Sequence, residues 1–217
     1  YGNRPFDSAD DLWPLARRNA MRLWGMYLEH RGRRTSKWPH YFPIYERYFG
    51  KYVNTACTVL EIGVARGGSL QIWKKYFGPL AQIVGVDIDP TCREYTEPQI
   101  SVAVGDQADT QFLTRLVSEI GVPDIVIDDG CHDLGVTLAT AAVLFPLLRD
   151  NGVYVIEDLN PVSTDFWQIV PACNVYGLHL YDQITVIEKT MVREPLNSMC
   201  VGRIGSPCHT TDLPELL

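Results

Sequence analysis

Short apolar runs alternate with helical stretches and glycine-containing turns from residue 57 onward, and this alternation constrains the fold more than any other feature. Five runs read as strands, at residues 58–62, 82–86, 100–104, 124–127 and 153–156. The first, fourth and fifth are almost wholly apolar, which is typical of strands buried on both faces. Helical stretches lie between several of these strands, so the pattern predicts a parallel sheet with right-handed crossovers.

The last two strand-like runs are joined by a much shorter connection. Two further strand-like runs, 175–181 and 184–189, are separated only by Asp182 and Gln183. So short a connection permits only an antiparallel hairpin. We therefore expect an α/β domain with a doubly wound, mostly parallel seven-stranded sheet and an antiparallel C-terminal hairpin. This Rossmann-like arrangement is the usual shape of a class I methyltransferase.

The N-terminal part has a different pattern. Residues 8–30 carry an apolar stripe at helical spacing, and residues 41–49 form a short aromatic segment. We expect residues 1–50 to form a short helical lid near the acceptor, and residues 51–217 to form the ligand-binding core. The aromatic side chains of the lid, Trp38, Tyr41, Tyr45 and Tyr48, either wall the acceptor or pack a helix onto the sheet.

Charge and composition narrow the class of protein. The net charge of −7 argues against a nucleic-acid partner, because such proteins usually carry a basic surface. The one basic cluster, 31–34 with Lys37, reads as a solvated loop, with phosphate binding as the alternative. No apolar run is long enough to span a bilayer and no signal peptide is visible, so we expect a cytoplasmic protein without membrane contact. The six cysteines read as free thiols, with Cys200–Cys208 as the one possible disulfide.

The turn after the first strand carries glycines at 63, 67 and 68, flanked by Glu61 and Ser69. Glycine allows the backbone to approach a ligand closely, but this spacing is not the Gly-x-Gly-x-x-Gly of dinucleotide-binding proteins. Glu61 supplies a carboxylate for an ammonium group, as an adenosyl sulfonium ligand requires. The alternative is a structural turn without a ligand.

Three more strand ends carry polar groups that fit the same ligand. Asp87 suits ribose hydroxyls, Asp106 and Gln107 suit an adenine amino group, and Asp128 lies near the expected methionine portion. The expected S-adenosylmethionine site comprises Glu61, Gly63, Arg66, Gly67, Ser69, Asp87, Asp106, Gln107 and Asp128.

Carboxylates also cluster at the ends of the fourth and fifth strands. Asp129, Glu157 and Asp158 follow neighbouring strands, so they can converge on one divalent cation, with Mg²⁺ the expected ion. His132 lies three residues after Asp129 and titrates near neutrality, which suits a general base. The alternative is that each acid is solvated or caps a helix.

Residues 58–159 resemble the metal-dependent sugar O-methyltransferases and are similar in fold to cephalosporin-hydroxylase-type proteins. The matching pieces are VLEIGVARGGS, GVDID, DDGCH and VIED, with KWPHY upstream. The resemblance implies a catalytic His132, metal ligands at Asp129, Glu157 and Asp158, and acceptor contacts from His40 and Tyr41. The family more often has Ser at position 131 than this chain's Cys. We expect the large N-terminal domain of some members to be absent here, which argues against their tetramer, and we expect a homodimer.

The expected activity is methyl transfer from S-adenosylmethionine to a sugar hydroxyl of a small-molecule or oligosaccharide acceptor. A catechol-type or other small-molecule O-methyltransferase, and a non-catalytic S-adenosylmethionine-binding protein, remain alternatives. The glycine spacing disfavours a NAD-dependent dehydrogenase. The charge and the Asp-Asp-Gly ending of the fourth strand disfavour a DNA methyltransferase.

Overall fold

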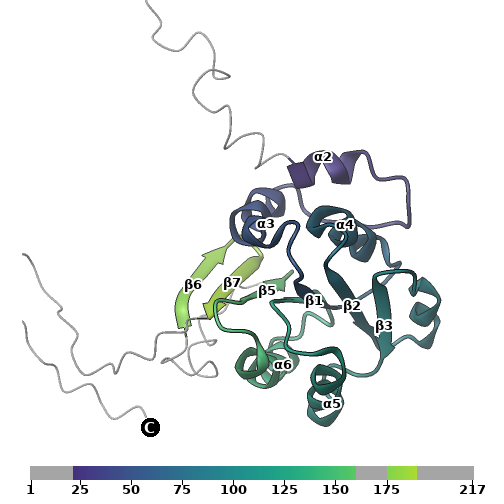
Figure 1. Cartoon of the computed structure of the whole chain (residues 1–217). Helices are drawn as coiled ribbons and strands as arrows, with labels where there is room; N and C mark the ends of the chain where they lie inside the picture. The colour runs from purple at the N-terminus through teal and green to yellow at the C-terminus, as the bar shows by residue number, and fades with distance from the viewer. Residues whose placement is uncertain (1–21, 160–174, 190–217) are drawn as a thin grey trace, which may run out of the picture.

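A computed structural model describes residues 22–159 and 175–189 (Figure 1). Its elements, in chain order, are α2 (Arg22–Leu28), α3 (Tyr41–Phe49), η1 (Gly50–Tyr52), β1 (Thr58–Ile62), α4 (Gly68–Phe77), β2 (Gln82–Asp87), η2 (Pro90–Tyr95), β3 (Ile100–Val104), α5 (Thr110–Ile120), β4 (Ile125–Asp128), α6 (Leu134–Leu147), β5 (Val153–Glu157), β6 (Val175–Tyr181) and β7 (Ile184–Lys189).

The strands of the described residues form one seven-stranded sheet in the order β3-β2-β1-β4-β5-β7-β6. Strands β1 to β5 pair in parallel, whereas β7 runs antiparallel to both β5 and β6. The predicted doubly wound sheet with an antiparallel C-terminal hairpin is therefore confirmed. The strand order reverses between β1 and β4, which is the switch point where such sheets bind ligands.

Helices cover both faces of the sheet. In Figure 1, α2, α3 and α4 lie on one side, and α5 and α6 lie on the other. Each face has its own buried apolar cluster, so strand residues that point in opposite directions enter different cores. Val59 belongs to the cluster under α3 and α4, for example, and Leu60 to the cluster under α5 and α6.

Capping residues explain where α5 begins and ends. The Asp109 side chain accepts hydrogen bonds from the backbone N–H groups of Gln111 and Phe112, which have no partner within the helix. Gly121 ends the helix with φ of +85°, a conformation that glycine adopts readily.

The aromatic segment packs onto the sheet, which is the alternative to walling an acceptor. Six of the nine residues of α3 are buried, and they pack into the core beneath the helix with Trp73 of α4. Burial of so much aromatic surface explains why the segment joins the core rather than walling an acceptor. Helix α2 lies within the predicted helix 8–30, of which residues 8–21 fall outside the described part.

Two further expectations concern the environment. Within the described residues, no helix combines the length and apolar character needed to cross a bilayer. Cys57, Cys92 and Cys131 are free thiols, and the other three cysteines, with the possible Cys200–Cys208 disulfide, lie outside the described residues.

Candidate cofactor and metal site

The polar residues singled out in the sequence meet at the carboxyl edge of the sheet. Ile62 at the end of β1 pairs with Asp128 at the end of β4, and Asp128 pairs with Ile156 of β5. This register brings the turns after β1, β4 and β5 to one edge, so residues far apart in sequence share a site.

The turn after β1 is tightly packed against the turn after β4. Gly63 has φ of +92°, and a Cβ atom there would collide with the backbone carbonyl of Asp129. The Asp129 N–H also donates to the Ile62 carbonyl at 2.9 Å. Glycine at position 63 therefore lets the two turns touch, and it lies between two cavities.

The first cavity has a volume of about 330 Å³ and lies beside the ends of β2 and β3. Its lining residues are Ile62, Gly63, Val86, Asp87, Ile88, Gly105, Asp106, Gln107, Ala108, Gly130, Cys131 and Val136. Asp87 accepts backbone N–H groups of Val64 and Ala65 at 2.9 Å each, so it also fixes the glycine turn. The predicted nucleoside residues Asp87, Asp106 and Gln107 thus line one apolar-walled cavity.

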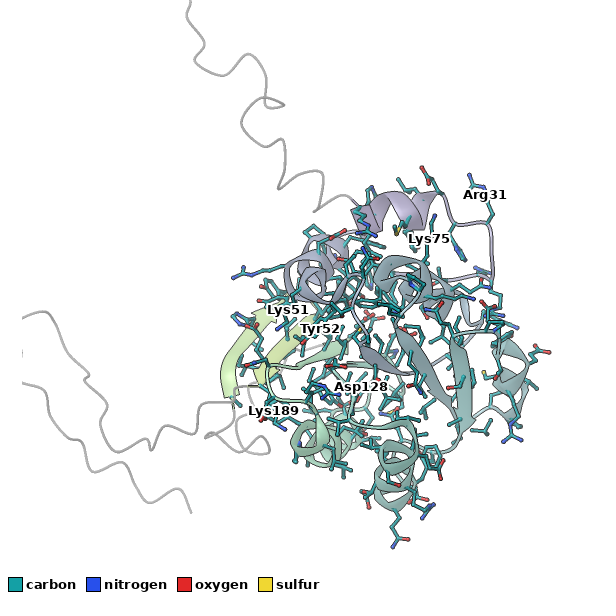
Figure 2. All side chains as sticks on the ribbon, viewed as in Figure 1. Arg31, Lys51, Tyr52, Lys75, Asp128 and Lys189 are labelled. Carbon is teal, nitrogen blue, oxygen red and sulfur yellow. The ribbon has the colours of Figure 1, made fainter. Side chains whose placement is uncertain are left out.

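Gln107 organises the back of this cavity. Its amide donates to Asp128 at 3.2 Å, and its oxygen accepts the Cys131 N–H at 2.9 Å. Burial raises the pKa of Asp128 to about 6, although the hydrogen bond from Gln107 opposes the shift. Figure 2 shows Asp128 within the body of the fold. Asp128 therefore acts on the cavity through Gln107, because it is buried and does not line the cavity itself.

The second cavity, of about 220 Å³, lies on the other side of Gly63. Its lining residues are Arg34, Thr35, Ser36, Lys37, Gly63, Val64, Ala65, Arg66, Gly68, Ser69 and Asp129. Next to it, Glu61 is completely buried, and Ser69 donates to its Oε2 atom at 2.9 Å. The other carboxylate oxygen, Oε1, has no hydrogen-bond partner. This oxygen lies 3.5 Å from the Lys37 ammonium group, so it already faces a cationic amine and fits a ligand ammonium group.

Only two of the three acids expected to bind a metal, Asp129 and Asp158, belong to one close group. Ligand atoms of Asp129, His132 and Asp158 lie within 4.8 Å of one another, close enough for one metal ion. Both His132 and Asp158 have positive φ, of +55° and +57°, which is strained for residues other than glycine. Strained backbone of this kind is common at functional sites.

Glu157, the third expected ligand, does not belong to this group of three. It is buried, and it accepts hydrogen bonds from Tyr45 at 2.6 Å and from Lys37 at 2.7 Å. Burial raises the pKa of Glu157, and the positive charge of Lys37 opposes that shift. Lys37 also donates to Asp129 at 2.6 Å. The Lys37 ammonium group therefore links Glu157 to the acid group.

Lys37 corrects the interpretation of the basic cluster as a solvated loop. Its side chain is only 5% exposed. Burial alone would lower its pKa, but Asp129, Glu157 and Glu61 outweigh that effect and raise the pKa of Lys37 well above its usual value. Arg31 does point away from the fold (Figure 2), whereas Arg33 forms an ion pair with Glu97 at 2.9 Å. Lys37 and Arg33 therefore hold the segment in place through ion pairs with acids that lie far away in the sequence.

The two expected acceptor residues have different surroundings. His40 is exposed, and its ring hydrogen-bonds with the Asp182 carbonyl at 2.9 Å. Tyr41 is completely buried, and its hydroxyl donates to Asp158 at 2.6 Å. Tyr41 therefore holds an acid of the site in place and does not line an open acceptor surface.

Comparisons with known proteins identify relatives of the whole site region, although no protein-family model matches. The 8-demethyl-8-alpha-L-rhamnosyl tetracenomycin-C 2'-O-methyltransferase of Streptomyces olivaceus is 39% identical over 207 residues, which are 91% of this chain and 49% of the relative. The mycinamicin VI 2''-O-methyltransferase of Micromonospora griseorubida is 44% identical over 136 residues, 59% of this chain and 33% of the relative. This chain is homologous to sugar O-methyltransferases.

A solved structure agrees with these homologues. The MycE methyltransferase from the mycinamycin biosynthetic pathway, in complex with Mg, SAH and mycinamycin VI, superposes with a TM-score of 0.65 at 32% identity, over 79% of this chain and 53% of that protein. The class I methyltransferase fold is thus confirmed. The chain spans about half or less of the length of these homologous enzymes.

Proposed function

We propose that the chain is an S-adenosylmethionine-dependent O-methyltransferase that acts on a sugar hydroxyl with the help of a divalent metal. One observation carries the proposal: two cavities share Gly63, and Asp129 of the acid group lines the second of them. A methyl donor in these cavities and a cation at the acids would therefore be neighbours.

The cavities match the two ends of the methyl donor. Asp87 and Asp106 offer carboxylates to ribose and adenine from the larger cavity, and Gln107 fixes its floor. Glu61 offers Oε1, which accepts no hydrogen bond, to the ammonium group from beneath the smaller cavity, beside Ser69. The exposed Arg66 is then available for the methionine carboxylate.

Asp129 and Asp158 are the acids best placed to hold a divalent ion, with Glu157 as a third ligand once it is free of Lys37. The donors are carboxylate oxygens, which Mg²⁺ prefers. A bound Mg²⁺ would supply Lewis acidity that favours loss of the proton from an acceptor hydroxyl. Tyr41 and Tyr45 orient two of these carboxylates by donating hydrogen bonds to them.

His132 is the group that would accept the acceptor's proton. Its side chain is 40% exposed, and Nε2 lies 3.9 Å from Asp129 Oδ1. The ring can therefore reach a hydroxyl next to the acid group, and the neighbouring carboxylate stabilises the imidazolium that forms. In this role His132 works beside the metal rather than as its ligand.

The acceptor class rests on the homologues, two of which are named as methyltransferases of rhamnosyl tetracenomycin and mycinamicin VI. Trp38 follows Lys37 and is 51% exposed, so it offers an aromatic face to a sugar ring. His40 is exposed beside it, with the two rings 6.3 Å apart. The homodimer, the cytoplasmic location and the absence of a nucleic-acid partner stay predictions.

A transfer assay tests the proposal. The protein is incubated with S-adenosylmethionine labelled in its methyl group, and with a rhamnosylated polyketide, a macrolide glycoside or a catechol. We expect label in a glycoside when Mg²⁺ is present, and none in excess EDTA. Labelling of the catechol alone, or full transfer in EDTA, would contradict the proposed acceptor class or the metal site respectively.

A further inference from the structure

We propose that Lys37 is a built-in cation that competes with the divalent metal for Asp129 and Glu157, so that metal entry releases the middle of the strap formed by residues 31–40. The inference rests on the metal site of the proposed function. It adds a regulatory role for a side chain that otherwise has no part in the chemistry.

The geometry places the ammonium group where the ligands would converge. Lys37 Nζ lies 2.6 Å from Asp129 Oδ2 and 2.7 Å from Glu157 Oε2, with Glu61 Oε1 at 3.5 Å. A metal held jointly by Asp129 and Glu157 needs oxygens that now bind Lys37. Two cations repel strongly in a site shielded from water, so both cannot share these oxygens.

The charge balance also favours an exchange of cations. Glu61, Asp129 and Glu157 surround one ammonium group, and two of these three carboxylates are fully buried. Buried carboxylates without a counter-charge strongly destabilise a fold. Lys37 supplies that counter-charge, and a divalent ion supplies more of it at the same place.

Displacement of Lys37 would reach beyond the acids, because the strap crosses the glycine turn. The Arg33 guanidinium is anchored to the Gly67 carbonyl at 3.3 Å. A Cβ atom at Gly68 would collide with the Arg33 carbonyl, so the strap lies directly on this turn. Residues 34–37 then form one wall of the smaller cavity. Release of Lys37 would free the middle of the strap, while Arg33 holds one end and His40, bonded to the Asp182 carbonyl, holds the other.

The alternative is that Lys37 is a permanent counter-ion. A metal bound by Asp129, His132 and Asp158 alone would leave the ammonium group on Glu157. The two possibilities differ in whether Lys37 moves, and this difference is measurable.

The first test measures Mn²⁺ binding by electron paramagnetic resonance at fixed ionic strength. Lys37→Met is compared with wild type and with Lys51→Met, which removes an equal charge from an exposed lysine bound to the Asn151 carbonyl. We expect Lys37→Met to bind Mn²⁺ about tenfold more tightly or better, and Lys51→Met to match wild type. Equal or weaker binding by Lys37→Met would overturn the competition alone. No binding by any of the three proteins would overturn the metal site as well.

The second test uses the wild-type protein and so does not depend on how the variant folds. Reductive methylation of lysines is followed by peptide mass spectrometry with Mg²⁺ or with K⁺ at matched ionic strength, and Lys51 is the internal reference. We expect Lys37 to be labelled several-fold faster in Mg²⁺, because its buried amine is released. Unchanged or slower labelling would overturn displacement, even if Lys37→Met binds Mn²⁺ more tightly.

Discussion

At the scale of single residues, two glycines with nearly the same φ have different surroundings. Gly63 has φ of +92° and touches the Asp129 carbonyl, whereas Gly121 has φ of +85° and faces open space. We expect Gly121→Ala to lower the free energy of unfolding by about 1 kcal/mol through backbone strain. Gly63→Ala should cost clearly more and weaken S-adenosylhomocysteine binding. Urea unfolding and calorimetry measure both effects, and equal losses in the two variants would contradict the close contact.

His132 carries the proposed proton transfer. A general base contributes roughly 10²–10⁴-fold to a rate, so His132→Ala should lose kcat in that range while it keeps its affinity for S-adenosylhomocysteine. His40→Ala, at the exposed histidine beside Trp38, should instead mainly raise KM for the acceptor. Steady-state kinetics and calorimetry separate these effects. A near-normal kcat in His132→Ala would remove it as the base.

The sequence predicts the position of a side chain best where that residue directly follows a strand. Asp87 and Asp129 could be placed at the sheet edge because the end of a parallel strand fixes the position of the next residue. Lys37 could not be placed in this way. Its partners lie 92 and 120 positions further along the chain, and no local pattern links a lysine in a loop to acids so distant.

At the scale of elements, helix α3 supports the acid group with its hydroxyl groups. Tyr41 donates to Asp158, whereas Tyr48, on the same helix, pairs with the Tyr181 hydroxyl away from the acids. Loss of a hydrogen bond to a metal ligand typically weakens metal binding 10–100-fold, so Tyr41→Phe should reduce Mn²⁺ affinity by about tenfold. Tyr48→Phe is the matched control and should bind as wild type does. Identical affinities would mean that Tyr41 does not orient Asp158.

The sequence predicted the strands better than the position of α3. Periodicity and turn residues located β1 to β7 within about one residue at their ends. The buried strands β1, β4 and β5 are continuous apolar runs, and short turns delimit the C-terminal hairpin. The same logic could not place α3. An aromatic segment has the same sequence pattern whether it covers a site or fills a core. Only its packing against Trp73 and the sheet shows that α3 belongs to the core.

At the scale of the whole molecule, ligand binding should stabilise the native state, because both cavities lie at strand ends and exist only when the sheet is folded. A ligand at a concentration of 100 times its Kd stabilises the native state by about 2.7 kcal/mol. For a chain of this size that corresponds to a rise in Tm on the order of 5–10 °C. We expect this shift with S-adenosylhomocysteine and none with NAD at the same concentration, as measured by scanning calorimetry. A comparable shift with NAD would favour a dinucleotide-binding protein instead.

The most direct test of the combined site is a crystal structure with S-adenosylhomocysteine and Mn²⁺, with the metal located by anomalous scattering. We predict adenosine in the cavity lined by Asp87 and Gln107, and the ammonium group on Glu61. Mn²⁺ should lie within bonding distance of Asp129 and Asp158, with His132 beside it and unligated. Ligand density outside the two cavities that meet at Gly63, or Mn²⁺ bound away from these acids, would contradict the account.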